Sequence, residues 1–219
     1  MAVTVNTARR AELPAPLLER LRKVPVAIIA DVSAGACLID PAIRPLQPPG
    51  KGVRLFGRAV TARCAAPDFG AVLHALDLVG EGDVLVIDAQ GNRDHAMIGG
   101  ILGGHLRRIG AAGVVCDGAV RDVMELAAWD DFAVFSRSIT PRGPTAWEQG
   151  EVNGTVTIGG RAVGPGDLII GDDDGLVALT AEEANVYIDK AEQKLALEAK
   201  WIDSLASGQS VAQVFGLPK

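Results

Sequence analysis

The sequence predicts an α/β fold, with a mixed sheet flanked by helices, a β-rich C-terminal part and a long last helix. Two continuous apolar runs, residues 82–89 and 113–118, are typical of strands buried on both faces of a sheet. Segments with helical spacing follow both runs, which is the alternation expected of βαβ units. Residues 152–180 then contain short β runs separated by Gly-Gly, Pro-Gly and Asp-Gly turns. A helical segment over residues 181–207 comes next.

The length and composition predict a single domain. A chain of 219 residues is long enough for one domain with a sizeable core and short for two. Its 48% hydrophobic and 22% charged residues are those of an ordinary globular protein. The β-rich part follows the α/β part without a linker, so we expect residues 1–219 to form one unit.

The segments before the first buried run are less uniform. Residues 14–24 are expected to form a short helix, because prolines stand at its start. Residues 24–38 are apolar and fit either a helix or a strand. After a Pro- and Gly-rich connection, residues 57–64 fit a strand, and residues 68–79 fit a helix with Asp68 as its N-cap.

Later segments complete the expected order of elements. Residues 96–110 and 121–129 fit helices, and residues 132–138 fit a strand. The acidic stretch at 171–177 superficially resembles a calcium-binding loop, but it lacks the remaining positions of an EF-hand. We therefore expect it to be a turn between two strands.

The charge balance excludes several classes of partner. The formal net charge is −6, from 21 Lys and Arg and 27 Asp and Glu, so no basic footprint for nucleic acid or for an anionic membrane is present. No apolar stretch approaches the length of a membrane span. The three cysteines are widely spaced and form neither a metal-type pattern nor a disulfide framework. We expect a cytoplasmic protein that binds neither nucleic acid nor membrane.

Four glycines in the segment 96–110 need an explanation, because each costs about 1 kcal/mol relative to alanine inside a helix. They are Gly99, Gly100, Gly103 and Gly104. One interpretation is close packing of this helix on a neighbouring strand. The other is that backbone N–H groups at the helix start face an anion, such as a small carboxylate. The spacing alone leaves both open.

A cluster of charged residues follows the second buried run, where α/β proteins place ligands. Arg121 offers a planar fork that suits a carboxylate or an enolate oxygen. Asp122 offers a hard oxygen ligand for Mg²⁺, and Glu125 can share a helix face with it. The same spacing also fits a capping box, with Asp122 as N-cap and Glu125 at N3. The two interpretations are compatible.

The last helix carries an apolar stripe that one carboxylate interrupts. The position that completes the stripe between Leu195 and Ile202 is Glu198. A carboxylate inside a buried stripe is expensive unless it has a partner. Alternatively Ala199 takes the stripe position and Glu198 stays at its hydrated edge.

Two stretches together identify a family resemblance. Residues 82–122, which contain "GDVLVIDA" and "GAAGVVCDGAVRD", and residues 159–179, "GGRAVGPGDLIIGDDDGLVAL", resemble the RraA-like family. This family includes the class II 4-hydroxy-4-methyl-2-oxoglutarate/4-carboxy-4-hydroxy-2-oxoadipate aldolases. The resemblance covers roughly residues 25–208. It implies an α/β/β sandwich of the swivelling type, assembled as a homotrimer or a hexamer with active sites at subunit interfaces.

The resemblance also implies roles for residues. Arg121 would bind the pyruvyl part of a 2-oxo acid substrate, and Asp122 would hold Mg²⁺ or Mn²⁺ directly or through water. A glutamate of a neighbouring subunit's last helix would correspond to Glu198. The backbone amides of the glycine-rich helix would bind the substrate carboxylate; these residues are Gly99, Gly100, Ile101 and Leu102.

One position departs from the family pattern. Some family aldolases carry Asp-x20-Arg-Asp, whereas this sequence has Gly100 at the first position, with Glu125 as a second carboxylate instead. The expected function is metal-dependent cleavage of a 4-hydroxy-2-oxo acid to pyruvate and a second oxo acid, with oxaloacetate decarboxylation as a possible second activity. The alternative is a non-catalytic regulator of ribonuclease E. No lysine lies between residues 52 and 189, which agrees with a metal route rather than a Schiff base.

Overall fold

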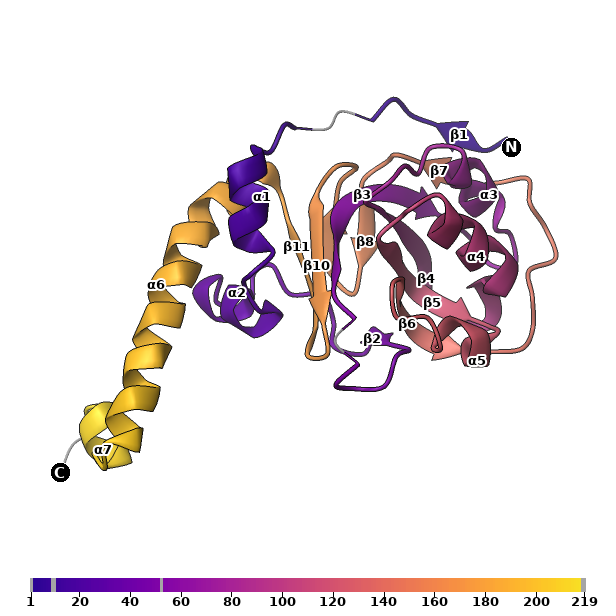
Figure 1. Cartoon of the computed structure of the whole chain (residues 1–219). Coiled ribbons are helices and arrows are strands. Elements are labelled where there is room, and N and C mark those ends of the chain that lie inside the picture. Colours follow the sequence, from indigo (N-terminus) through magenta and orange to yellow (C-terminus); the bar gives the residue numbers. More distant parts are fainter. Residues whose placement is uncertain (1, 9–10, 52, 218–219) are drawn as a thin grey trace.

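A computed structural model describes residues 2–8, 11–51 and 53–217 and contains a large mixed sheet (Figure 1). Its strands are β1 (Thr4–Val5), β2 (Arg44–Pro45), β3 (Leu55–Arg63), β4 (Asp83–Ile98), β5 (Gly113–Val120), β6 (Ala133–Ile139), β7 (Glu151–Val152), β8 (Val156–Ile158), β9 (Arg161–Val163), β10 (Leu168–Asp172) and β11 (Gly175–Leu179). The helices are α1 (Ala15–Leu21), α2 (Val26–Val32), α3 (Gly70–Leu76), α4 (Gly100–Arg108), α5 (Val123–Leu126), α6 (Ala181–Ala206) and α7 (Val211–Val214).

The centre of the sheet is parallel. Strands β3, β4, β5 and β6 lie side by side in that order, and the antiparallel hairpin β10–β11 joins through β10 to β3. Parallel strands end at the same edge, so the carboxyl ends of β4, β5 and β6 lie together. The register pairs Ile98 with Val120, and Val120 with Ile139, at this edge.

Three layers form around this sheet, which confirms the predicted α/β/β class. Helices α3, α4 and α5 bury one face, through residues such as Val72, Leu106 and Leu126. The hairpins β8–β9 and β10–β11 bury the other face. Helices α1, α2 and α6 then pack on the outer side of β10–β11, on the left in Figure 1.

Two buried carboxylates attach β8 to the sheet. Asp88 of β4 accepts a hydrogen bond from the Thr157 N–H at 3.2 Å, and Asp117 of β5 accepts one from the Gly159 N–H at 2.6 Å. The Asp117 carboxylate also pairs with Arg137 of β6. A buried carboxylate is stable only with such partners, so this polar group fixes where the β layer sits.

Several predicted elements are shifted or settled by the structure. The segment 24–38, which fits a helix or a strand by sequence, contains helix α2. The segment 171–177 is the turn between β10 and β11, as predicted. The predicted helix 121–129 is the single turn α5. The predicted start of α4 was wrong, because residues 96–98 still belong to β4.

Helix α6 begins as part of the core and ends away from it. A capping box formed by Thr180 and Glu183 starts the helix. Its first half buries Ala184, Ile188 and Ala191, whereas its second half and α7 project from the body (Figure 1). No helix among the described residues is long and apolar enough to cross a membrane.

Candidate functional site

The candidate site lies at the shared edge of the parallel strands, where β4 leads into α4 and β5 leads into α5. A small cavity of about 40 Å³ opens there. That volume suits a small group such as a carboxylate, since about 10–15 Å³ of space on this measure holds one water molecule. The cavity is lined by Phe69, Ala96, Met97, Ile98, Gly99, Ile101, Leu102, Arg121, Asp122 and Pro144. The structure thus brings together Arg121, Asp122 and the start of the glycine-rich helix, as the sequence predicts.

Asp122 caps a helix, but not its own. It stands before α5 with a left-handed backbone, φ +57°, and makes no side-chain cap bond to α5. Its Oδ2 instead accepts a hydrogen bond from the backbone N–H of Gly100, at 2.9 Å, at the start of α4. Asp122 thus stands at the N-cap position of α5, as that interpretation expects, but the capping box with Glu125 is not formed. The left-handed conformation, which Asp tolerates better than most residues, accompanies this redirection of the carboxylate toward the neighbouring helix.

Arg121 lies between this carboxylate and a loop. Its Nε is 3.6 Å from Asp122 Oδ2, and its side chain is about 42% exposed. On the other side the backbone of Gly143 approaches the guanidinium, because a Cβ built on Gly143 would lie 2.6 Å from Arg121 Nη1. Arg121 is thus confined by close neighbours but still offers hydrogen-bond donors to the cavity.

Glu125 explains one of the glycines. A Cβ built on Gly100 would lie 2.2 Å from Glu125 Oε2, so the carboxylate of Glu125 occupies the space of a side chain at position 100. A Cβ on Gly103 would meet Leu126 at 3.0 Å and the Trp129 ring at 3.3 Å. Close packing is therefore confirmed as a reason for the glycines, and the neighbour is the α5 segment rather than a strand.

The start of α4 offers N–H groups to the cavity. The first N–H groups of a helix have no partner within the helix. That of Gly100 is taken by Asp122, and among the described residues no acceptor is assigned to those of Ile101 and Leu102, which line the cavity. The predicted anion site is thus partly filled by the protein's own carboxylate.

The rim of the site is apolar and uncovered. Sequence periodicity places Ile101 on the apolar face of α4, yet its side chain is 81% exposed, and Met124 of α5 is 94% exposed. The buried positions of α4 are Gly100, Gly103 and Leu106. Ile101 lines the cavity, whereas Met124 lies two residues after Asp122, so both exposed apolar side chains belong to the segments that form the site.

Glu198 does not join the other predicted residues within one chain. It lies in the projecting half of α6, on the opposite side of the molecule from α4 and α5 (Figure 1). Its Oε1 is 3.6 Å from Nζ of Lys194. The stripe around it is buried only at its start, because Ile202 is 66% and Leu205 is 38% exposed.

The sequence analysis missed one wall of the cavity. Residues 140–149 follow β6 and form a loop beside Arg121, with Pro144 in the cavity wall and Gly143 against the guanidinium. A signal existed, since β6 is parallel to β5 and its carboxyl end lies at the same edge.

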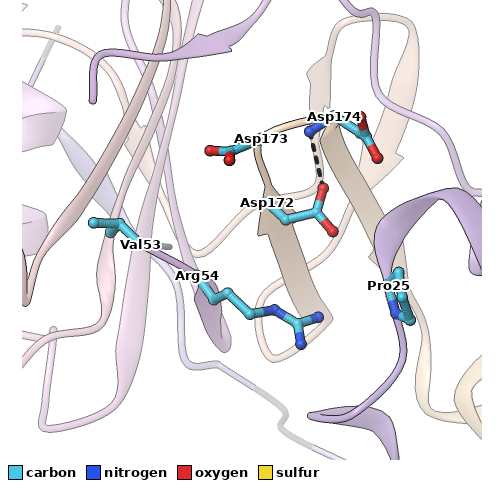
Figure 2. Close-up of a pocket in the computed structure, with 6 residues that line it drawn as sticks. All are labelled: Pro25, Val53, Arg54, Asp172, Asp173 and Asp174. Atoms are coloured by element: carbon cyan, nitrogen blue, oxygen red, sulfur yellow. Dashed lines mark hydrogen bonds between the residues drawn. The ribbon is translucent and has the colours of Figure 1, made fainter. Parts of the chain in front are cut away.

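A larger cavity lies far from this site, between α2 and the β10–β11 turn (Figure 2). Its polar groups are used within the fold. Asp172 accepts hydrogen bonds from the N–H groups of Val26 and Asp174, the second of which is dashed in Figure 2. Asp173 accepts one from Gly50, and Arg54 donates to two backbone carbonyls. The acidic turn therefore has a structural role, because its carboxylates bind the backbone of α2, of residue 50 and of the turn itself.

The metal donors on one chain are few. Among residues 2–8, 11–51 and 53–217, no group of three or more His, Cys, Asp or Glu side chains could enclose a metal ion. At the candidate site the donors are the carboxylates of Asp122 and Glu125, both exposed. Such a donor set fits Mg²⁺, which is commonly held by one or two carboxylates and keeps several waters.

The family model described as "Aldolase/RraA" matches residues 2–178. The chain belongs to the RraA-like family. A relative from Halalkalibacterium halodurans is 33% identical over 179 residues, which are 82% of this chain and 83% of the relative, and carries the provisional name 4-hydroxy-4-methyl-2-oxoglutarate aldolase.

Solved structures agree with this membership. The RNA-processing inhibitor RraA from Thermus thermophilis is 29% identical, with a TM-score of 0.63 over 72% of this chain and 93% of that one. An uncharacterized protein from Pseudomonas syringae has a TM-score of 0.81, covers 93% of this chain and 98% of its own, and at 24% identity shows the fold alone. Because the Thermus protein is named for inhibiting RNA processing, the similarity does not support the expectation that this chain has no link to nucleic acid.

Proposed function

We propose that this RraA-like protein is a divalent-metal-dependent lyase that cleaves 4-hydroxy-2-oxo acids to pyruvate and a second oxo acid. The observation that carries the proposal is the convergence of Arg121, Asp122 and the first turn of α4 on one small cavity. The name of the Halalkalibacterium relative supports the substrate class. Oxaloacetate decarboxylation, which passes through the same pyruvate enolate, is proposed as a second activity.

The chain's own groups suit the charges of such a reaction. Arg121 binds the pyruvyl end and stabilises the negative oxygen that develops as the bond between C3 and C4 breaks. The free N–H groups of Ile101 and Leu102 bind the C1 carboxylate. A water polarised by Glu125, or by Glu198 of the partner subunit, relays the proton of the C4 hydroxyl to that carboxylate, and return of a proton to C3 of the enolate completes pyruvate.

A metal ion completes the set. Asp122 and Glu125 would hold Mg²⁺ or Mn²⁺, and Asp122 is already fixed by its hydrogen bond from Gly100. Once bound, the ion would supply Lewis-acid polarisation of the 2-oxo group. Two carboxylates near one guanidinium leave a net negative charge at the site, which favours the binding of a dication.

A second copy of the chain is proposed to close the site. The apolar rim, Ile101 and Met124, and the exposed apolar side chains of the projecting half of α6 are different surfaces of the same molecule. When unlike patches of identical chains meet, the contact is head-to-tail, and it closes into a ring when the rotation allows. We propose that the ring is a homotrimer, or a hexamer of two trimers, as the family resemblance implies, with Glu198 brought to a neighbour's cavity.

Purified protein tests the proposal directly. Pyruvate release from 4-hydroxy-4-methyl-2-oxoglutarate should stop with a chelator and return with Mg²⁺ or Mn²⁺. Asp122→Ala should abolish turnover, whereas Asp172→Asn, in the remote turn of Figure 2, should leave it unchanged. Full turnover by Asp122→Ala would show that the assigned metal ligand is wrong.

A second candidate function is inhibition of RNA processing. It is favoured by Gly100, which replaces the aspartate of some family aldolases, and by the similarity to the RNA-processing inhibitor from Thermus. Addition of this protein to a ribonuclease E cleavage assay would decide between the two. Inhibition without any pyruvate release would support the regulator and refute the lyase.

A further inference from the structure

We infer that Asp68 is a positioning residue of the candidate site, because it fixes the loop 140–149 and, through Gly143, the guanidinium of Arg121. The inference rests on the proposed function for its ligand. Its structural part concerns only how the loop is held. Asp68 itself does not line the cavity.

Asp68 is a buried carboxylate, only 6% exposed, with three backbone donors. Oδ1 accepts hydrogen bonds from the N–H groups of Gly70 at 2.8 Å and Gln149 at 3.2 Å, and Oδ2 accepts one from Glu148 at 2.9 Å. The sequence predicts Asp68 as the N-cap of its helix. In the structure Phe69 holds that position, and Asp68 bonds the first N–H of α3 from one residue earlier.

Only one of these three bonds serves the helix. The other two reach across 80 or more residues of sequence to the far end of the loop 140–149. Backbone bonds continue the attachment, since Thr145 donates to Pro67 O at 3.1 Å and Phe69 donates to Ala146 O at 3.0 Å. Gly70 permits this contact, because a Cβ there would lie 2.7 Å from Trp147 O. The loop is thus clamped to the start of α3.

The near end of the loop carries the contacts with the site. The N–H of Ala96, at the end of β4, donates to Arg142 O at 2.8 Å. Gly143 follows and confines Arg121 Nη1, and Pro144 then lines the cavity. Backbone bonds at Thr145 and Ala146 hold the segment between the two ends, and Asp68 fixes the residues just beyond them, so loss of Asp68 loosens the attachment that keeps Gly143 and Pro144 in place. Arg121 then loses the wall that orients it.

Asparagine at position 68 is the informative substitution. It keeps the size of the side chain but replaces one carboxylate oxygen by an NH₂ group, which donates and cannot accept. Both oxygens of Asp68 accept hydrogen bonds from backbone N–H groups. The NH₂ group of asparagine must therefore face a backbone N–H, and that hydrogen bond is lost. We expect residues 147–149 to lose their attachment to α3 in Asp68→Asn, and the rest of the loop to be held less firmly by its remaining backbone bonds.

The experiment compares full-length wild type and Asp68→Asn by hydrogen exchange and by calorimetric titration with oxalate in the presence of Mg²⁺. Oxalate is a planar dicarboxylate that resembles the pyruvate enolate. The backbone N–H groups of residue 143 and residues 145–149 should exchange about tenfold faster, and the Kd for oxalate should rise about tenfold, which corresponds to about 1.4 kcal/mol. Both are measured well below the unfolding temperature.

Two further variants separate positioning from general stability. Gly70→Ala pushes the loop away without touching the Asp68 charge, so it should change exchange and affinity in the same direction. Asp172→Asn removes a carboxylate that likewise accepts two backbone N–H groups, but in the remote β10–β11 turn. It should lower the unfolding temperature and leave oxalate affinity unchanged.

The outcomes are decisive in each case. Unchanged exchange at 143–149 in Asp68→Asn would overturn the inference, and so would faster exchange with unchanged oxalate affinity. If wild type neither binds oxalate nor releases pyruvate, the proposed function fails, and the exchange rates alone then decide whether Asp68 holds the loop.

Discussion

The carboxylate of Glu125 lies against the backbone of Gly100, where a side chain at position 100 would otherwise stand. A Cβ on Gly100 would be 2.2 Å from Glu125 Oε2 and 2.9 Å from its carboxyl carbon. The two positions are therefore alternatives: an acidic group can enter this part of the site from α4 or from α5, but not from both without a shift. A side chain at position 100 therefore requires the exposed carboxylate of Glu125 to leave its present position.

The first prediction is a rescue by exchange of the two positions. Gly100→Asp alone should lower both stability and pyruvate release, because the new side chain meets Glu125. The double variant Gly100→Asp/Glu125→Ala should recover part of both, with a coupling of about 0.5–3 kcal/mol in the free energy of unfolding, as expected for residues in contact. Urea denaturation measures the free energy of unfolding of the two single variants and the double variant, and a pyruvate assay measures their turnover.

The control for this cycle is Gly104→Asp, in the same helix, where a Cβ would meet nothing closer than the Trp129 ring at 3.9 Å. It should show no coupling to Glu125→Ala. Additive effects of Gly100→Asp and Glu125→Ala would contradict the steric argument.

The second prediction separates the two tasks of Asp122. Asp122→Asn keeps an acceptor for the Gly100 N–H and tolerates the left-handed backbone, so its unfolding free energy should stay near that of wild type. Asp122→Ala loses the cap and should be less stable by about 1 kcal/mol or more. Both variants should lose metal-dependent turnover, because both lose the charge. Metal-dependent activity at the wild-type level in Asp122→Asn would remove this carboxylate from the metal site.

The third prediction concerns Gly143. Gly143→Ala places a methyl group 2.6 Å from Arg121 Nη1, so the guanidinium must move. The KM for the oxo acid should rise several-fold with little change in stability, as steady-state kinetics and thermal unfolding would record. Gly104→Ala is the matched control, since an alanine inside a helix should stabilise the protein by up to about 1 kcal/mol and leave KM unaltered. An unchanged KM in Gly143→Ala would show that Arg121 adapts freely.

The sequence predicts the buried strands well, because the apolar runs that became β4 and β5 are determined by burial on both faces. It fails where the backbone departs from regular geometry. β4 continues past Asp88 through irregular register to Ile98, and polar residues 90–95 hide this continuation. A bulge inserts an extra residue into a strand and interrupts the alternation of inward and outward side chains by which a strand is recognised in a sequence.

The candidate site shows the same limit. Arg121 and Asp122 could be predicted, since they follow a buried strand. The direction of the Asp122 carboxylate could not, because it depends on a positive φ, and the sequence pattern does not indicate a positive φ at a residue other than glycine. The exposure of Ile101 could not be predicted either. Periodicity indicates which side chains share a face, and it does not indicate whether the same chain or another one covers that face.

The fourth prediction is a pH dependence of stability at Asp68. Burial raises the pKa of its carboxyl, but the backbone hydrogen bonds from Gly70, Glu148 and Gln149 together lower the pKa by more than burial raises it. The pKa in the folded protein therefore lies below its ordinary value. The folded state then binds fewer protons than the unfolded state. The stabilisation is complete above the ordinary carboxyl pKa of about 4 and is lost as the pH falls through the folded pKa. The stability gap between wild type and Asp68→Asn should therefore be largest near neutral pH and narrow below pH of about 4. A gap that is constant with pH would mean that the charge is not responsible.

The fifth prediction tests whether a second chain completes the site. The projecting half of α6 exposes Ile202 at 66%, with Leu197 and Leu205 also uncovered, and the Glu198 that lies among them cannot reach Arg121 of its own chain. Ile202→Asp should leave the free energy of unfolding of the separate chain almost unchanged, because this side chain packs on nothing in its own core. The proposed oligomer should dissociate, as sedimentation velocity would show, and pyruvate release should fall with it. Val186→Asp, at an exposed apolar position in the first half of the same helix, should change neither. Glu198→Gln should keep the assembly intact and lower kcat. These three variants distinguish a contact surface from a charge in the site, and an Ile202→Asp protein with unchanged mass and full activity would mean that the cavity works within a single chain.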